Sequence, residues 1–527
     1  MKKIFLFALA ALPCVAVQAQ DTYLNDRATN TSDVIGTARY VGMGGAMGAL
    51  GADISTISNN PAGIGLMRRG TFSFTLGGQI NDAKPAFGDS RGSFTFDQIG
   101  VVIPFGDVGD DTRLNFAFNY QKKINYNQGI YTSQPLGGLS QGDMFAWIAN
   151  STYRTNDNGQ YYFDSPFYDN LYLAGFFGEY TNPAGDTYFR NVNAGETGIY
   201  YRNSSGSLQG YEFNLSGSVS DRWYWGLTFG VDHMVYRHSA SYEELGDDSY
   251  ILYQDQALKG NGFNFKAGAI IRPLEDSPLR FGLTVETPTW YSLEHTGEAA
   301  LSTLVDGRYS QASYMDDRNL LDYNVYSPWK FRASLGSTVE DYLAWDVEYE
   351  YSMNNYTKMG YPDDYDDYYY GEGSTISMDK DQAMNEMTHA NIRGVHNVRA
   401  GLEIKPFSKM AVRVGYNFFS KPYKKGARLD QTCNTPAYDW STSTEYINLG
   451  ATNLFTLGLG YQGKHFFADI AYKYRVQRGD YYSFDDQFTR LNESFIGENP
   501  QLSGKTLQPS EVNLDRHNIA VTLGYRF

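Results

Sequence analysis

Histidines are the residues of this chain best suited to acid–base or metal chemistry, and there are seven of them: His233, His238, His295, His389, His396, His465 and His517. None belongs to an HExxH or paired-cysteine motif, which would bring metal ligands together. No Gly-x-Ser-x-Gly elbow marks a serine as a nucleophile. The sequence therefore predicts neither an enzyme nor a resident metal or cofactor.

Charged side chains offer two other kinds of binding site. The acidic run 363–367 has oxygen ligands for Ca²⁺, but it lacks the spacing and the turn glycine of an EF-hand, so we expect a solvated loop. Cations that could meet a carboxylate stand at Arg68, Arg69, Lys122, Lys123, Arg154 and Arg190. Single cations beside strands are more often solvated or paired than engaged with a ligand.

The elements that would position any such site are β-strands. At the carboxyl end, Ile519, Val521, Leu523, Tyr525 and Phe527 alternate with other residues, and a period of two predicts a strand over 517–527. The same alternation predicts thirteen more strands, over 71–79, 94–103, 113–121, 209–219, 222–236, 262–271, 280–290, 329–338, 342–351, 397–405, 410–419, 453–462 and 465–475. The total of fourteen is even.

The lengths of the connections indicate how these strands close. Short turns such as 220–221 and 340–341 alternate with long polar connections such as 122–208 and 352–396. Short turns at one end and long loops at the other are typical of outer-membrane barrels. We therefore predict an all-β fold, a 14-stranded antiparallel transmembrane β-barrel over residues 70–527, with its largest extracellular loop at 122–208.

Charge placement predicts which face of the wall is inside. Asp346, Glu348 and Glu350 share one face of a predicted strand. A charge that faces lipid at mid-depth costs about 2–4 kcal/mol for Arg or Lys and less for acids, so these carboxylates should face the lumen. Arg332 and Arg399 have matching parity on the neighbouring strands, which predicts ion pairs across the inner wall.

The beginning of the chain has the features of a secretory signal peptide over residues 1–19, with two lysines, an apolar run and a cleavage site after Ala19. No later run of 18 apolar residues occurs, which excludes a helical membrane protein. Cys433 would be the only cysteine after cleavage, so no internal disulfide is expected. The net charge of −16 argues against a nucleic-acid partner.

Between the signal peptide and the first strand lies a glycine-rich segment, 35–69. Its apolar residues Met43, Met47 and Leu50 do not suit a surface linker, and Asn60-Pro61 predicts a turn. An even number of strands puts both chain ends at the short-turn side. We therefore predict that residues 20–69 fold into the inner mouth of the barrel as a plug.

Several residues of this plug occur in a characteristic order: Ala38-Arg39, Gly42-Met43-Gly44-Gly45-Ala46, Asp53 and Asn60-Pro61-Ala62-Gly63. They resemble the amino-terminal hatch of FadL-like outer-membrane transporters of long-chain fatty acids and aromatic hydrocarbons. The resemblance implies passive uptake of hydrophobic compounds, with release gated by movement of Asn60, Pro61, Ala62 and Gly63. The same four residues could equally form a rigid turn that fixes the plug.

The resemblance also implies a place and partners. A terminal Phe527 that closes the last strand resembles the signal that bacterial outer-membrane barrels present to the barrel assembly machinery. The expected location is the outer membrane of a Gram-negative bacterium, in contact with its lipid and lipopolysaccharide. The expected ligands are hydrophobic small molecules such as fatty acids, and no cofactor is expected.

The longest loop has two apolar stripes at helical spacing, one of Met144, Trp147 and Ile148 and the other of Tyr168, Leu171, Tyr172 and Phe176. These side chains could pack on one another to order the loop, or they could form a groove that captures a hydrophobic ligand. Each buried methylene contributes about 0.8 kcal/mol, so a few carbons in such a groove give useful affinity.

The second predicted strand contains a phase slip. Phe94 and Phe96 have even parity and Ile99 has odd parity, so we expect a β-bulge at Asp97-Gln98. The bulge could open a lateral exit or only curve the wall. In the FadL-like family the exit is a kink in the third strand, and the strand 113–121 has no Gly or Pro that would mark one.

Two other functions stay open. Some relatives of the FadL-like family are described as hemin receptors, and His389 or His396 in an outer loop could ligate haem iron. A structural or adhesive barrel would instead use its long Tyr-rich loops for contact with other cells.

Overall fold

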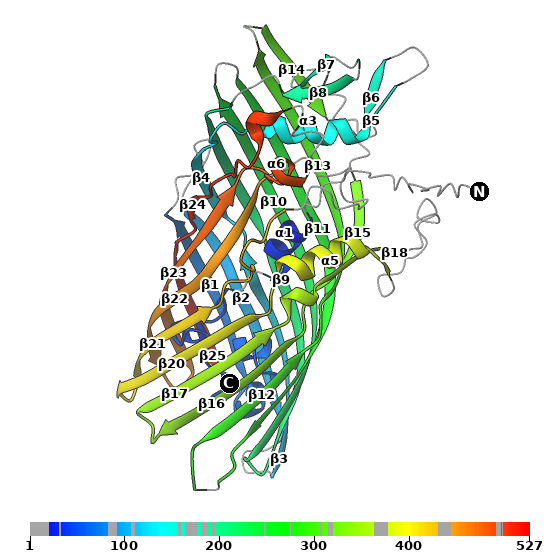
Figure 1. Ribbon diagram of the computed structural model, residues 1–527. Helices are drawn as coiled ribbons and strands as arrows, with labels where there is room; N and C mark the ends of the chain where they lie inside the picture. Colours follow the sequence, from blue (N-terminus) through cyan, green and yellow to red (C-terminus); the bar gives the residue numbers. More distant parts are fainter. Residues whose placement is uncertain are drawn as a thin grey trace, which may run out of the picture.

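The computed structural model describes residues 21–30, 33–82, 92–106, 111–155, 160–163, 172, 177–181, 185, 187–191, 195–246, 249–274, 276–305, 308–314, 320–362, 378–429, 444–491, 497 and 499–527. These residues form a closed β-barrel whose lumen contains the beginning of the described chain (Figure 1). The predicted signal peptide, the acidic run 363–367 and Cys433 lie outside the described residues.

The wall of the barrel has fourteen positions in the described chain, some of them filled by two strands in line. In order they are β1 (Thr71–Asn81), β2 (Gly92–Phe105), β3 (Thr112–Asn125) with β4 (Gln128–Pro135), β9 (Thr197–Val219), β10 (Trp223–Leu245), β11 (Ser249–Ile271), β12 (Arg280–Glu286) with β13 (Trp290–Val305), β15 (Leu320–Tyr326) with β16 (Lys330–Val339), β17 (Leu343–Ser352) with β18 (Lys358–Pro362), β20 (Val395–Phe407), β21 (Met410–Phe419), β22 (Tyr446–Gln462), β23 (Phe466–Tyr482), and β24 (Ser510–Asn513) with β25 (Arg516–Arg526).

Antiparallel pairing runs all the way round this wall. β1 pairs with β25 from Thr71↔Arg526 to Asn81↔Arg516, which closes the barrel. Phe527 donates its backbone N–H to the carbonyl of Gly70 at 2.9 Å, so the last residue is fixed beside the start of the first strand. The predicted 14-stranded antiparallel barrel is confirmed, and each predicted strand overlaps one wall position.

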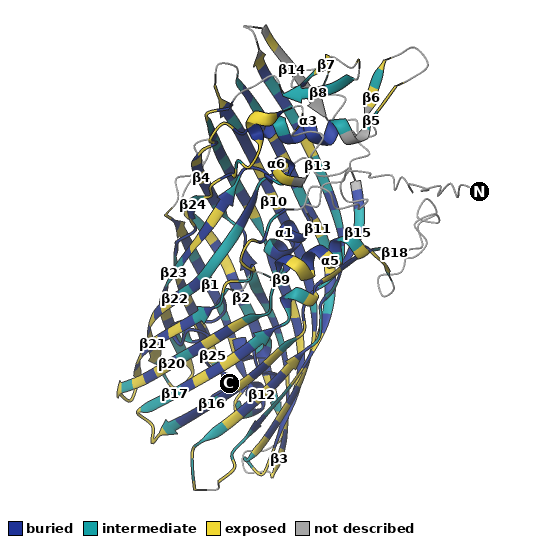
Figure 2. Cartoon of the chain, in the orientation of Figure 1, coloured by how far each residue is buried: buried dark blue, intermediate teal, exposed yellow. Residues whose placement is uncertain are grey.

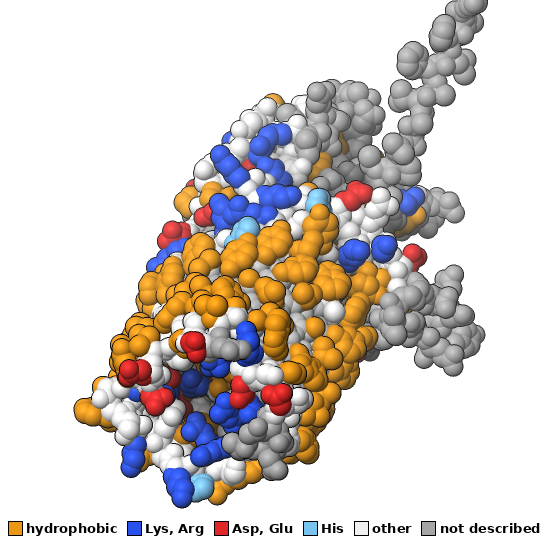
Figure 3. Space-filling model, turned by 90° about the horizontal axis from the view of Figure 1, so that it is seen from below, with side chains coloured by type: hydrophobic (Ala, Val, Ile, Leu, Met, Phe, Trp, Pro, Cys, Tyr) orange, Lys and Arg blue, Asp and Glu red, His pale blue; other side chains and the backbone are white. Residues whose placement is uncertain are grey.

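Outward side chains form an apolar belt around the wall. On β20, β21 and β22 its exposed members include Val398, Leu402, Ile404, Val412, Val414, Leu457 and Leu459. Burial alternates along the strands (Figure 2), and the belt surrounds the short-turn end of the molecule (Figure 3). A continuous exposed apolar surface of this size needs a lipid environment, so the barrel spans a membrane.

Some strands extend well beyond the belt at the long-loop end. β9, β10 and β11 each have 23 residues, whereas a tilted strand crosses a bilayer with about 9–11. The sequence predicted only the membrane part of β9 and β11, because above the belt the outer face meets water and the apolar alternation fades.

The hatch is the described segment that precedes the barrel, residues 21–30 and 33–69. It contains five short helical elements: α1 (Asp21–Asn25), η1 (Asp26–Asn30), α2 (Ala38–Gly42), η2 (Ile54–Ser58) and η3 (Pro61–Leu66). The sequence placed the whole plug at the inner mouth. Only its later part lies there, since α1 contacts α5 (Gln382–Asn391) in the half of the barrel nearer the long loops (Figure 1).

Several smaller elements cover the long-loop end: α3 (Gln141–Thr152), β5 (Tyr153–Thr155), β6 (Tyr161–Phe163), β7 (Phe177–Thr181), β8 (Thr187–Asn191), β14 (Arg308–Tyr314), α6 (Phe488–Leu491) and η8 (Pro500–Leu502). Two more, η5 (Asn354–Tyr356) and β19 (Met378–Lys380), flank β18. Among the described helices, none is long and apolar enough to cross a bilayer.

Candidate functional site

Glycines on the inner wall make the surface on which the hatch rests. We call this set the glycine collar: Gly226, Gly268, Gly282, Gly336, Gly401, Gly415 and Gly458. A Cβ on Gly226 would lie 2.6 Å from the backbone nitrogen of Ala62, and one on Gly458 would lie 3.1 Å from the Cα of Gly42. Only a wall without side chains at these positions lets the hatch backbone approach so closely.

The four predicted gate residues lie at the start of η3, where Asn60 is the N-cap, and Asn60, Pro61 and Ala62 rest on Gly226 and Gly268 of this collar. The Asn60 side chain accepts a hydrogen bond from the Ala62 N–H at 3.2 Å and donates one to the carbonyl of Gly48 at 2.7 Å. Pro61 occupies the first position of η3, where its missing N–H costs nothing. Asn60, Pro61, Ala62 and Gly63 are all buried. This geometry favours the rigid turn, and a gating movement of these residues stays a prediction.

Ion pairs join neighbouring strands on the inner face of the wall. Arg332 binds Glu350 and Glu286, and Arg399 binds Glu348 and Glu350. The predicted pairing of inward charges on these strands is therefore present.

The hatch completes this network. The Asn59 side chain accepts from Arg399 at 2.9 Å and donates to Glu348 at 2.7 Å. Asp346 accepts hydrogen bonds from the backbone N–H groups of Ala49 and Leu50, at 2.9 and 2.8 Å. The inward carboxylates thus bind both the wall and the hatch backbone.

Nearer the long loops the lumen becomes apolar. We call this region the outer apolar layer: Tyr23, Leu24 and Ala28 of the hatch, Leu208, Met234, Leu258 and Leu293 of the wall, and Met384 and Met387 of α5. The Tyr23 ring stacks on Tyr423 with centroids 4.9 Å apart, and the Tyr323 hydroxyl donates to Asn25 at 2.9 Å. α1 therefore closes the lumen with aromatic and aliphatic contacts.

A layer of buried polar side chains lies above the outer apolar layer, one to three inward positions further along each strand. This polar layer consists of Arg202, Ser204, His238, Gln254, Gln256 and His295. Both ring nitrogens of His238 and of His295, and Nε and Nη1 of Arg202, have no hydrogen-bond partner among the described residues. Buried polar atoms are normally satisfied, so these are groups that a bound molecule or water would complete.

The loop cap above the polar layer is built on α3. Met144, Trp147 and Ile148 are buried against Phe145, Phe177, Phe189, Phe484 and Phe488, which is the packing that orders the loop. Tyr172 packs against the same cluster, whereas Tyr168, Leu171 and Phe176 lie outside the described residues. A capture role for these seven residues stays a prediction.

An acidic group is buried at the amino end of α3. Asp143 accepts from the Ser140 N–H at 2.9 Å in a capping box, and Glu244 accepts from the Gln141 N–H at 3.1 Å. Burial, with a smaller contribution from the Glu244 carboxylate, raises the pKa of Asp143 to about 7. The stability of the loop cap is therefore sensitive to pH near neutrality.

The wall is interrupted where the sequence predicted a bulge. Thr75 pairs with Gln98 and Leu76 with Phe96, so Asp97 is the extra residue. The ladder between β2 and β3 stops at Gln98↔Gln121, and residues 92–96 pair with β1 alone. Behind this part of β2, Gln79 on β1 donates to the carbonyl of Asn127 at 2.6 Å. The bulge thus coincides with a lateral separation of two wall strands, and its use as an exit stays a prediction.

The two histidines proposed for haem have separate partners. His389 on α5 is exposed and lies beside Tyr356, with ring centroids 5.5 Å apart. His396 on β20 is exposed and bonds through Nδ1 to the Tyr349 hydroxyl at 2.7 Å. In the described part of the chain no group of three or more His, Cys, Asp or Glu side chains could hold a metal ion.

Sequence reasoning missed the glycine collar and the polar layer. A signal for the collar exists, because inward positions on neighbouring strands repeatedly carry glycine. No comparable signal marks Arg202, His238 and His295, since only the register of β9, β10, β11 and β13 brings them to one level.

A lipid-facing belt, a closed wall and a lumen filled by the preceding segment define the class of this protein as a transmembrane β-barrel with an internal hatch. No family model matches the chain, and no curated protein matches it. Among solved structures it is similar to the Ralstonia pickettii toluene transporter TbuX (14% identity, TM-score 0.47, 94% of this chain and 99% of that one). It is also similar to a Pseudomonas aeruginosa FadL homologue (12%, 0.47, 94% and 100%) and to the P. putida toluene transporter TodX (12%, 0.45, 94% and 99%).

Proposed function

We propose that this barrel is an outer-membrane protein for the passive uptake of hydrophobic compounds such as long-chain fatty acids. The observation that carries the proposal is the pairing of two layers inside the lumen, a polar layer with unpartnered buried groups and an apolar layer directly beneath it. An amphiphile would satisfy both layers at once, with its head group at Arg202 and its chain among the methionines and tyrosines below. Neither layer serves a water-filled pore.

In this proposal the ligand first meets the loop cap around α3 and then enters the outer apolar layer. α1 occupies that layer, so the ligand must displace it, and release is gated by the hatch. The separation of β2 from β3 at Asp97 offers a lateral route that avoids the polar ion-pair network below. Transfer sideways keeps an acyl chain in apolar surroundings, where each methylene is worth about 0.8 kcal/mol.

A disulfide that locks α1 in place tests the proposal. Thr22 on α1 and Thr388 on α5 lie with their hydroxyl oxygens 2.9 Å apart, which suits a cysteine pair. Cys433 is replaced by serine in all variants. Uptake of radiolabelled oleate and of toluene is measured in a Gram-negative host that lacks its own uptake channel. We expect the oxidised Thr22→Cys/Thr388→Cys protein to lose uptake of both compounds, and reduction to restore it.

Each single-cysteine variant serves as the matched control and should transport normally under oxidising conditions. Heat-modifiable migration of the barrel on gels verifies assembly in every case. Equal uptake by the oxidised and reduced double variant would show that the ligand does not pass through the layer that α1 occupies. Absence of any uptake by the unmodified protein would count against the function itself.

A further inference from the structure

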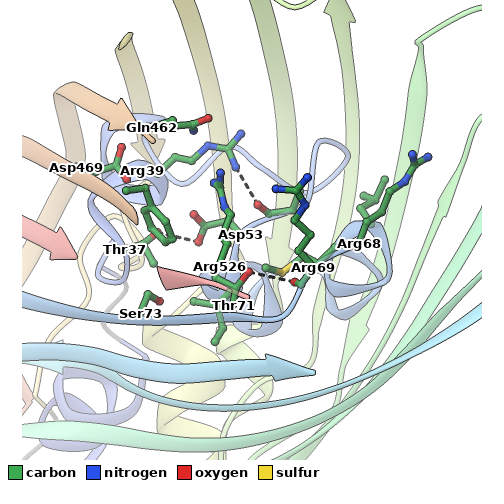
Figure 4. A pocket seen from close by; sticks show the side chains of 15 residues that line it. Thr37, Arg39, Asp53, Arg68, Arg69, Thr71, Ser73, Gln462, Asp469 and Arg526 are labelled. Atoms are coloured by element: carbon green, nitrogen blue, oxygen red, sulfur yellow. Dashed lines mark hydrogen bonds between the residues drawn. The ribbon is translucent and has the colours of Figure 1, made fainter. Parts of the chain in front are cut away.

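At the short-turn end, between the hatch and the wall, lies a cavity of about 350 Å³. Its wall includes the ends of β1, β23 and β25, and its roof is the hatch (Figure 4). Basic and acidic side chains are visible in the hollow of this end, inside the apolar belt (Figure 3). The volume lies within the range of small-molecule sites.

Four arginines line this cavity, namely Arg39, Arg68, Arg69 and Arg526, together with two acids, Asp53 and Asp469. The acids are already engaged. Asp469 binds Arg413 at 2.6 Å, and Asp53 accepts from the Thr37 hydroxyl at 2.7 Å and from the Ser55 N–H at 3.0 Å. The lining therefore has an excess of positive charge.

Two of the four arginines, Arg69 and Arg526, carry this excess, because the other two are paired with acids. Arg39 is paired with Glu403 at 3.1 Å, and Arg68 with Asp221 at 3.0 Å. Among the residues that the structure describes, no acidic group lies within 4 Å of the guanidinium of Arg69 or of Arg526. The positive charges of Arg39 and Arg69 act on Arg526, as do the negative charges of Asp469 and Asp53, so charges of both signs meet at this cavity and the arginines are in excess.

An apolar surface lies beside these cations. Ile54, Leu66 and Met67 of the hatch and Phe467 of β23 line the same cavity, and Arg526 lies over the Phe467 ring at 4.8 Å. Paired guanidinium forks match the planar oxygens of a carboxylate or a phosphate, and the adjoining side chains match an acyl chain.

We propose that this cavity binds the anionic head group of an acyl amphiphile at the inner mouth of the barrel. Arg69 and Arg526 are the head-group ligands, and Ile54, Met67 and Phe467 contact the first methylenes of the chain. The site is separate from the two layers near the long loops, because the hatch and its ion-pair network lie between them. If the ligand is a transported fatty acid, the inference rests on the proposed function. A phospholipid of the surrounding membrane would reach the site even if the barrel transported nothing.

Affinity and photo-crosslinking test this site. Dodecanoate and dodecanol are titrated against purified protein in a neutral detergent, and a diazirine-bearing fatty acid is crosslinked and mapped by mass spectrometry. In the unmodified protein we expect crosslinks at the inner mouth. In the variant Arg69→Gln/Arg526→Gln we expect the affinity of this site for dodecanoate to fall about tenfold or more, because two charge-assisted hydrogen bonds are lost. Affinity for dodecanol should change less than about twofold, since apolar burial is retained.

The control variant is Lys409→Gln, which removes one positive charge at an exposed short turn outside the cavity. Crosslinks confined to the long-loop half, or equal loss of affinity for acid and alcohol, would overturn the inference. Native mass spectrometry distinguishes the two sources of the head group. If phosphatidylglycerol copurifies with the unmodified protein but not with the double variant, the ligand is a membrane lipid. If only added dodecanoate is bound, the ligand is a transported acid. Continued toluene uptake by the double variant would leave the proposed function intact whichever result is obtained.

Discussion

Replacement of Gly226 by alanine should displace the hatch while the barrel remains assembled. The new methyl group would lie 2.6 Å from the nitrogen of Ala62 and at a similar distance from the Pro61 carbonyl, both of them backbone atoms that cannot rotate away. Overpacking of this kind costs about 1–3 kcal/mol. The wall is held by continuous hydrogen-bonded ladders, so the strain is relieved by movement of η3 away from β10. We expect a lower thermal midpoint for the hatch and higher single-channel conductance in planar bilayers.

Gly78 provides the matched control. It lies within β1, and a Cβ added there would meet nothing within 4 Å. Gly78→Ala should leave conductance, thermal midpoint and heat-modifiable migration unchanged. If Gly226→Ala behaves like Gly78→Ala in all three measurements, the close contact between the collar and the hatch does not hold η3 in place, and the case for a rigid turn at Asn60-Pro61 is lost.

Two further predictions concern the loop cap and the lateral separation. The Asp143 carboxyl has a pKa of about 7 when folded against 3.8 as its ordinary value, so the folded cap holds an extra proton between these limits. The cap is thus most stable below about pH 4 and loses this contribution as the pH rises through 7. After correction for the intrinsic exchange rate, which rises with pH at every amide, the protection factors of α3 amides should be lower at pH 8 than at pH 5, a difference that Asp143→Asn removes. Deletion of Asp97 should restore a continuous β1–β2 register and slow oleate uptake without loss of assembly, whereas unchanged uptake would identify the bulge as a source of curvature only.

The membrane part of the wall could be predicted from the sequence because lipid imposes a strict period of two. The same period revealed the bulge, since Phe96 and Ile99 change face across Asp97. Inward charges were equally readable, because an unpaired charge on the lipid face is too costly to keep. Above the belt this constraint ends, and 23-residue strands such as β10 continue where no apolar alternation marks them.

The sites themselves depend on register, which the sequence leaves open. Arg202, His238 and His295 are tens of residues apart and reach one level only because β9, β10, β11 and β13 pair in one particular alignment. The cavity at the inner mouth likewise joins Arg69 to Arg526, the first and the last parts of the barrel. A single arginine beside a strand does not indicate which distant arginine lies next to it in the fold. The sequence therefore predicted a solvated or paired side chain at Arg69.

The two ends of the hatch are held by different chemistry, which bears on where movement begins. Near the short turns η3 rests on the glycine collar, and the adjoining Asn59 belongs to the network of Arg399 and Glu348. At the other end α1 is held by aromatic stacking and by bonds to tyrosine hydroxyls, such as Tyr323 to Asn25 at 2.9 Å. A hydrophobic ligand competes directly for the aromatic contacts but offers nothing in exchange for buried ion pairs. We therefore expect the hatch to open from α1 while Asn60-Pro61 stays fixed, so that a disulfide at Thr22 and Thr388 blocks uptake and Gly226→Ala makes the barrel leak.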